Sequence, residues 1–390
     1  GRVGSLPGAQ RRGHTALAVL ADRRAFVFGG VDPSDVGAAS DGIVALPPSD
    51  EGWAAPVEVA KLPEGEFVSD EGDPYLGRAR VGATATAIET SGGPRVVIVG
   101  GRAGYDAPTD ATASWSVWDP DSLDVEAGGT MSVTRSDHLA LPLTSGEIVV
   151  FGGIEQGSPG GGSTFEVLTV DPPGSVPGAV DLAGAGDYGA FGVSVGDAAV
   201  VCTGGRVASD VIVPSDVCVR VGADGSVEPL DPLPEAVFGG AVAALPDGGL
   251  LVTGGIAGRT DEPDERIATG RAYRWSAAKG WSTLSGMVYP RAQHVMVGLP
   301  DGRVLVVGGV EQVGAFGAQT GARVQCTEVF DPETETFAQT TCGDLGSGQL
   351  PAVSIGGGVG LVVQGLQYDG LTAIGGEGIG VFGLIPVIDP

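Results

Sequence analysis

The chain contains three histidines, and each one occurs three residues after an arginine. Imidazole nitrogen is a common ligand for zinc-like metals, so these histidines are the first candidates for a metal site. Whether they can share a metal depends on the elements that hold them. The pairs are Arg11 with His14, Arg135 with His138, and Arg291 with His294.

A second set of charged side chains closely follows Gly-Gly pairs. If those pairs end equivalent strands, the charges converge on one end of the molecule and form a ring of mixed sign. This ring is the candidate ligand-binding site, and the alternative is that its charges only solvate the rim of the loops. Its members are Arg102, Glu155, Arg206, Arg259 and Glu311.

The Gly-Gly pairs recur along the chain, each after a β-rich apolar run. The intervals between successive second glycines are 71, 52, 52, 50 and 54 residues, and a weaker copy that ends at Gly365 follows 56 residues later. A period near fifty residues predicts a repeat architecture. The pairs are Gly29-Gly30, Gly100-Gly101, Gly152-Gly153, Gly204-Gly205, Gly254-Gly255 and Gly308-Gly309.

One repeat predicts a four-stranded meander. The apolar run before Gly308 suits a strand that is covered on both faces, and the Asp-Gly and Asp-Pro pairs predict turns between strands. Such a meander has no core of its own, so successive repeats must pack on one another. The predicted strands are 291–299, 303–307, 324–330 and 336–341.

These features resemble the kelch-repeat β-propellers, including the galactose-oxidase-like branch. A kelch repeat begins with an Arg-x-x-His-like start and has a second strand that ends in Gly-Gly. The match is partial, because Arg80 has Ala83 at the histidine position and the repeats near Asp187, Val237 and Ser347 lack both residues.

The resemblance covers essentially the whole chain. It implies an all-β, single-domain propeller with seven blades of four antiparallel strands. Residues 1–6 are expected to supply the outer strand of blade seven and so close the ring. The stretch 64–77 is an insertion, and such loops usually carry specificity. The expected blades are 11–63, 80–133, 135–183, 188–234, 238–286, 291–342, and 350–390 with 1–6.

In this fold the histidines occupy one equivalent position in blades one, three and six. They would lie roughly 10 Å or more apart, too far for one metal, so we expect them to tie inner strands to neighbouring loops. The resemblance also includes copper-radical oxidases, which need a tyrosine crosslinked to a cysteine and a second tyrosine beside a histidine. No tyrosine of this chain adjoins a histidine, so we expect no copper site. The tyrosines are Tyr75, Tyr105, Tyr188, Tyr273, Tyr289 and Tyr368.

Four cysteines form two pairs with equal spacing. Each pair falls on adjacent antiparallel strands of one blade, where opposed Cβ atoms lie about 4.5–5.5 Å apart. The other pairings would join blades four and six. We therefore predict disulfides Cys202–Cys218 and Cys326–Cys342, and an oxidising compartment, with free buried thiols as the alternative.

The formal net charge is −27. A surface this acidic repels phosphate backbones and anionic membranes. We therefore expect no nucleic-acid partner, and a membrane association only through an anchor before Gly1. No cofactor is predicted. Calcium is the one ion for which acidic clusters offer ligands, at Asp70, Glu71 and Asp73 and less so at 261–265, although neither cluster has EF-hand spacing.

These patterns predict a non-catalytic, extracytoplasmic binding or scaffold protein, such as a bacterial surface protein or lipoprotein that recognises a protein or glycan through its loops. One alternative is an enzyme that acts on a carbohydrate or small metabolite at the channel mouth. Another is a structural subunit of a cell-surface assembly, with contacts between copies. The fold alone implies no activity.

Overall fold

The computed structural model describes residues 2–5, 16–22, 24–32, 35–49, 52–53, 57–68, 73–104, 110–153, 163–208, 211–259, 267–313, 324–342, 352–354, 360–363, 367–368, 373–374 and 380–382. Within these ranges the secondary structure consists of β-strands and turns, without a helix. Accordingly, this part of the chain has no helix long and apolar enough to cross a membrane.

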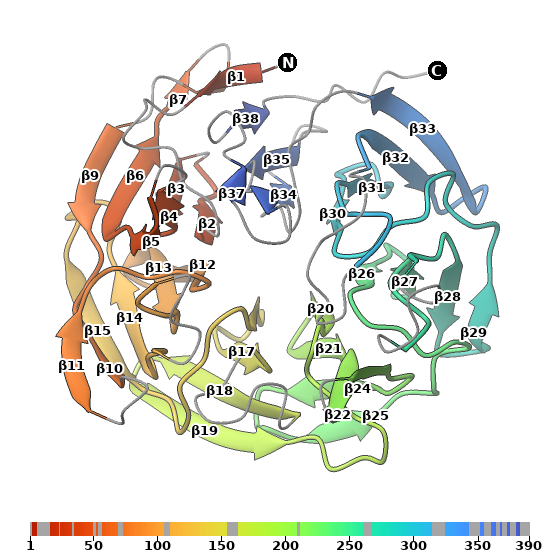
Figure 1. The fold of residues 1–390 in the computed structure, drawn as a ribbon, viewed down its shortest axis with the longest axis horizontal. Helices are drawn as coiled ribbons and strands as arrows, with labels where there is room; N and C mark the ends of the chain where they lie inside the picture. The colour runs from red at the N-terminus through yellow and green to blue at the C-terminus, as the bar shows by residue number, and fades with distance from the viewer. Residues whose placement is uncertain are drawn as a thin grey trace.

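Four-stranded antiparallel sheets follow one another around a ring, in the order of the sequence (Figure 1). The first strands of successive sheets contact one another, from β2 through β12, β16, β20, β26 and β30 to β34. Six sheets use strands in chain order: β2 (Ala16–Val19), β3 (Ala25–Phe28), β6 (Gly42–Leu46) and β9 (Val57–Lys61); β12 (Thr84–Thr90), β13 (Gly93–Val99), β14 (Ser114–Trp118) and β15 (Val125–Thr130); β16 (Leu139–Pro142), β17 (Ile148–Phe151), β18 (Thr164–Val170) and β19 (Pro173–Ala179); β20 (Phe191–Val195), β21 (Ala198–Cys202), β24 (Cys218–Gly222) and β25 (Val227–Pro229); β26 (Ala241–Ala244), β27 (Leu250–Thr253), β28 (Ala272–Ser276) and β29 (Gly280–Thr283); β30 (Val295–Gly298), β31 (Val304–Val307), β32 (Cys326–Asp331) and β33 (Thr336–Cys342).

A further four-stranded sheet combines the two ends of the chain. Its strand order is β1 (Arg2–Ser5), β38 (Gly380–Phe382), β35 (Gly360–Val363) and β34 (Ala352–Ser354). β1 pairs antiparallel with β38, and Ser5 lies opposite Gly380. The N-terminal segment therefore completes a sheet whose other strands come from the C-terminal region.

The described residues also form five short hairpins outside these sheets. They are β4 (Val31–Asp32) with β5 (Asp35–Ala39), β7 (Pro48–Ser49) with β8 (Gly52–Trp53), β10 (Gly65–Val68) with β11 (Pro74–Gly77), β22 (Gly205–Ala208) with β23 (Val211–Pro214), and β36 (Gln367–Tyr368) with β37 (Ala373–Ile374).

The core lies between neighbouring sheets. The second strands β13, β17 and β31 carry runs of consecutive buried residues because each has strands on both sides and a sheet on both faces. Trp118 packs edge-on against Phe26 and Phe28, at centroid distances of 5.1 and 5.5 Å, between the first two sheets. Trp115 lies in the core on the opposite face of the same sheet, as its spacing from Trp118 predicts.

Both predicted disulfides are confirmed. Cys202 and Cys218 lie opposite each other on β21 and β24, with a sulfur–sulfur distance of 2.03 Å. Cys326 and Cys342 lie opposite each other on β32 and β33, with a distance of 2.00 Å. The first bond is buried in the core beside the fifth sheet, whereas Cys342 is exposed.

Candidate functional site

Three repeat arginines lie buried at the Gly-Gly end of their sheets. Each donates a hydrogen bond to the carbonyl of the first glycine in its own repeat. Burial lowers the pKa of Arg80 to about 10, and burial also lowers that of Arg291, which forms an ion pair with buried Glu328. The bonds are Arg80 to Gly100 at 3.2 Å, Arg135 to Gly152 at 2.9 Å, and Arg291 to Gly308 at 2.9 Å.

The same arginines link neighbouring repeats through their backbone. The N–H of Gly101 donates to the carbonyl of Arg135 at 2.7 Å, and Gly30 and Gly255 make the equivalent bonds to the arginines that follow them. A Cβ atom on Gly100 would lie 2.3 Å from the Arg135 carbonyl oxygen, and φ there is +57°. The Gly-Gly pair thus allows one sheet to approach the next closely.

The described histidines hold neighbouring sheets together at two separate places. His138 Nε2 lies 2.9 Å from Thr84 Oγ1, and His294 Nε2 lies 2.8 Å from Thr253 Oγ1. Burial, with help from the adjacent repeat arginine, lowers the pKa of each histidine to about 3.

Each threonine–histidine pair has the distance of a nucleophile and its base. Both imidazoles are buried, which makes them weak bases. No cluster of three or more His, Cys, Asp or Glu side chains suited to a metal occurs in the described ranges. Arg11 and His14 lie outside those ranges.

The backbone two residues after each described repeat arginine, and after Asp187 and Val237 at the equivalent positions, forms a set of neighbouring segments that we call the collar. All five described collar residues have positive φ, between 54° and 65°. Three collar N–H groups donate to the collar carbonyl of the preceding sheet: Asp137 to Gly82 at 2.7 Å, Gly239 to Gly189 at 2.7 Å, and Gln293 to Gly239 at 2.6 Å. The collar joins the first strands at the Gly-Gly end of the channel.

Two of these five positions carry a side chain. A Cβ on Gly82 would lie 2.6 Å from Asp137 Oδ1, and a Cβ on Gly239 would lie 3.3 Å from Gln293 Cγ. Each side chain therefore lies over a glycine of the preceding sheet, which leaves room for it.

The Asp137 carboxylate pairs with the guanidinium of Arg102, and the two side chains are 23% and 6% exposed. Arg102 also donates to Ser136 Oγ at 3.2 Å. The collar thus carries a partly exposed carboxylate bound by a buried guanidinium, and a half-buried amide side chain at Gln293.

The predicted ring of mixed charge lies around this end only in part. Arg102 is buried against the collar, whereas Arg206, Arg259 and Glu311 are exposed. Glu155 lies outside the described residues. Asp137 and Gln293 were not predicted as site residues, although the sequence holds a signal: they stand where four other repeats have glycine, at Gly13, Gly82, Gly189 and Gly239.

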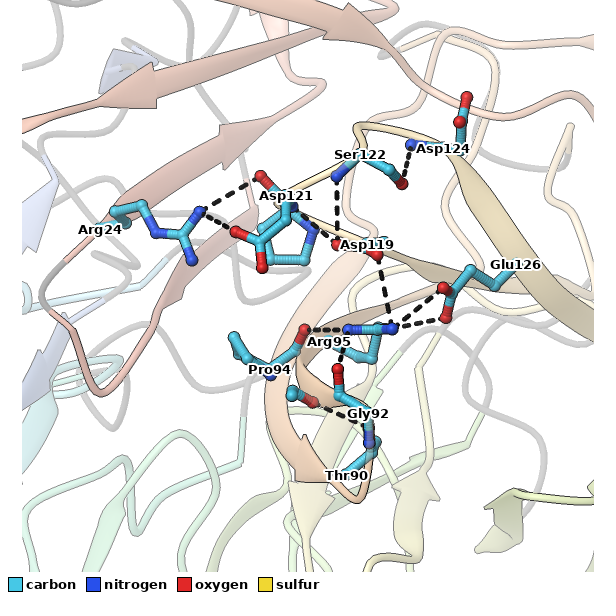
Figure 2. A network of polar contacts seen from close by, with 12 residues as sticks. Arg24, Thr90, Gly92, Pro94, Arg95, Asp119, Asp121, Ser122, Asp124 and Glu126 are labelled. Atoms are coloured by element: carbon cyan, nitrogen blue, oxygen red, sulfur yellow. Dashed lines mark hydrogen bonds and ion pairs between the residues drawn. The ribbon is translucent and has the colours of Figure 1, made fainter.

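The acidic turn 119–126, at the opposite end of the second sheet, forms ion pairs with two arginines (Figure 2). Arg95 forms ion pairs with Glu126 at 2.5 Å and with Asp119 at 3.4 Å, and Arg24 of the first sheet reaches Asp121 at 2.7 Å. The backbone N–H of Asp121 holds the pKa of Asp119 below its usual value. This turn therefore links two sheets.

The calcium candidates can be placed only in part. Asp73 is exposed, while Asp70, Glu71 and the second acidic cluster lie outside the described ranges.

Comparison with protein-family models gives no match, and comparison with curated proteins gives none either. Solved structures do match. One is YjhT, with 13% identity and a TM-score of 0.55, over 87% of this chain and 99% of that chain. Another is a fungal alcohol oxidase of the AA5 family in complex with copper, with 16% identity and a TM-score of 0.60. That match covers 95% of this chain and 78% of the oxidase chain. The chain therefore has the kelch and galactose-oxidase-like propeller fold; identities this low carry no function.

Proposed function

We propose that the protein is a non-catalytic recognition protein that binds a protein or glycan ligand at the collar end of its channel. The observation that carries this proposal is the presence of Asp137 and Gln293 at left-handed backbone positions where the other described repeats have glycine. A side chain in that conformation costs of order 1–3 kcal/mol and is retained where function needs it.

The chemistry of the collar suits hydroxyl-rich or peptide ligands. Asp137 offers acceptor oxygens, the Gln293 amide offers both a donor and an acceptor, and Arg102 holds the carboxylate in place. Because Arg102 is almost fully buried, this pair is less screened by water than a surface pair and can orient a ligand group. Polar groups fixed in this way provide specificity rather than bulk affinity.

The enzyme alternative has less support from the side chains. All four cysteines are paired in disulfides, so a tyrosine–cysteine crosslink would require one of them to open. The Nε2 atoms of His138 and His294 already form hydrogen bonds with threonine hydroxyls of the neighbouring sheets. We therefore place catalysis of a carbohydrate or small metabolite second.

At the level of architecture, we propose a seven-bladed ring closed by the pairing of β1 with β38. The two disulfides support an extracytoplasmic location, because such bonds persist in oxidising compartments. A surface or lipid-anchored protein fits this location, and assembly between copies is the remaining alternative.

The test compares Gln293→Gly with a matched control, Gln312→Gly, on a glycan array and a peptide library. Gln312 is exposed nearby on the rim but lies outside the collar. Glycine suits the backbone of position 293, so we expect the collar variant to keep its thermal midpoint while binding falls at least about tenfold. Unchanged binding together with a lowered midpoint would assign Gln293 a purely structural role. Conversion of a bound glycan, read by mass spectrometry, would support the enzyme alternative.

A further inference from the structure

The hairpin β10–β11 is an insertion that is firmly attached to the second sheet. Phe67 is fully buried and stacks on Tyr75, with ring centroids 5.6 Å apart. Thr112 Oγ1 donates to the Glu66 carbonyl at 2.5 Å, and the N–H of Glu66 donates to Ser114 Oγ at 3.2 Å. These contacts give the hairpin a fixed position beside β14, near the outside of the ring (Figure 1).

Backbone pairing connects this hairpin to Arg102, which lies beside the collar. Arg102 pairs with Val81 on one side and with Ala111 on the other, and the next residue, Thr112, pairs with Phe67 of β10. β10 then pairs with β11, and in the described part of the chain β11 pairs with no other strand. A small sheet, which we call the blade-two platform, thus runs from Arg102 to the free edge of β11.

The free edge is exposed and apolar. Leu76 is 71% exposed, the largest exposed fraction of any large apolar residue in the described ranges. The next are Val57, Val176, Ile267 and Val288, at 51–59%. Tyr75 is 37% exposed, and its hydroxyl donates to Asp110 Oδ2 at 3.0 Å, which fixes the ring. Edge strands are usually protected by lysine or by a covering element, and β11 carries no charged residue.

The surroundings of this edge are acidic. Glu64, Glu66, Asp73 and Asp110 lie on or beside the hairpin, and Arg78, the one base between residues 64 and 78, is paired with Glu64 at 3.0 Å. The whole chain carries a net charge of −27. Charge complementarity therefore favours a basic partner and disfavours a second copy of this chain.

We propose that the free edge of β11 binds an extended, basic peptide segment of a partner protein by β-strand addition. The backbone of the segment hydrogen-bonds to β11, an apolar side chain of the segment contacts Leu76, and a lysine or arginine faces Glu66. Alternate residues of β11 bond to β10, and Glu66, which lies opposite Leu76, directs its N–H to Ser114 instead. The outward donor of β11 is therefore the N–H of Leu76, because Pro74, the next outward residue, has no N–H and offers only its carbonyl. This proposal does not depend on a ligand at the collar.

The test uses the octapeptide Lys-Thr-Val-Thr-Lys-Thr-Val-Thr as the probe and the complete chain as the receptor. Lysine and valine share one face of this peptide, as Glu66 and Leu76 share one face of the hairpin. We expect saturable binding by titration calorimetry and slower hydrogen exchange at the amide of Leu76, the outward donor of β11. A peptide of identical sequence and charge, N-methylated at alternate residues so that one edge cannot donate, should bind at least about tenfold more weakly.

Protein variants test the location. Leu76→Lys places a positive charge on the edge and should weaken probe binding at least about tenfold. The matched control is Val176→Lys, because Val176 is 53% exposed on the outer strand β19 of another sheet. Both positions are exposed, so both variants should fold. Equal binding of the N-methylated peptide, equal effects of the two substitutions, or no binding of the probe would each overturn the proposal. Loss of collar binding in Gln293→Gly would leave this result unchanged, so the two proposals fail separately.

Discussion

Mild acid should destabilise the protein through His138 and His294. Both imidazoles are buried, and burial lowers their pKa from 6.5 to about 3. The folded state therefore keeps them neutral where the unfolded chain protonates them. Because the unfolded state then binds more protons, stability is complete above pH 6.5 and is lost as the pH falls toward the folded value.

The size of the effect follows from linkage. Each histidine contributes about 1.4 kcal/mol per pH unit within the window, so two contribute about 2.7 kcal/mol per unit. Between pH 6.5 and pH 5 the free energy of unfolding should fall by about 3 kcal/mol from these two residues, because the unfolded imidazoles are only half protonated at pH 6.5. Most carboxylates titrate below this window, so the histidines dominate the change.

The assay is urea unfolding at a series of pH values between 5 and 7.5, for the wild type and for His138→Gln/His294→Gln. Glutamine keeps a polar group near each threonine but has no titration in this range. We expect the double variant to be less stable at pH 7.5 and to lose most of the slope between pH 6.5 and 5. An identical slope in the two proteins would refute the burial argument. His14 is present in both and so cancels.

Two further predictions concern the Gly-Gly ends and the disulfides. Gly100→Ala places a methyl group 2.3 Å from the Arg135 carbonyl, whereas Gly196 has a similar φ of +60° and nothing within 4 Å. Gly100→Ala should therefore destabilise the protein by at least about 2 kcal/mol more than Gly196→Ala in the same urea assay, and equal losses would show that the contact is relieved. Limited treatment with a thiol reductant should open Cys326–Cys342 before Cys202–Cys218, because Cys342 is exposed and both residues of the other bond are 1% exposed. Alkylation and mass spectrometry identify the opened pair, and the reverse order would contradict the argument.

The sequence was sufficient for the fold and the disulfides because both are encoded by local spacing. The Gly-Gly pairs recur at nearly constant intervals and follow apolar runs, and such periodicity predicts repeated sheets. The cysteine pairs share one spacing of 16 residues, and strands that pair in sequence bring those residues opposite each other. These features need no knowledge of how one repeat sits on the next.

The candidate site was decided by the packing of one repeat on another. Arg102 was identified from the sequence as one of five charges on a rim, but its partner Asp137 comes from the following repeat, 35 residues away. The burial that makes the histidines weak bases likewise comes from neighbouring sheets. The free edge of β11 also depends on tertiary pairing: Phe67 of the inserted hairpin pairs with Thr112, just before β14, and this leaves β11 on the outer side. Spacing along one strand fixes which face a side chain takes, but only the tertiary structure determines what lies against that face.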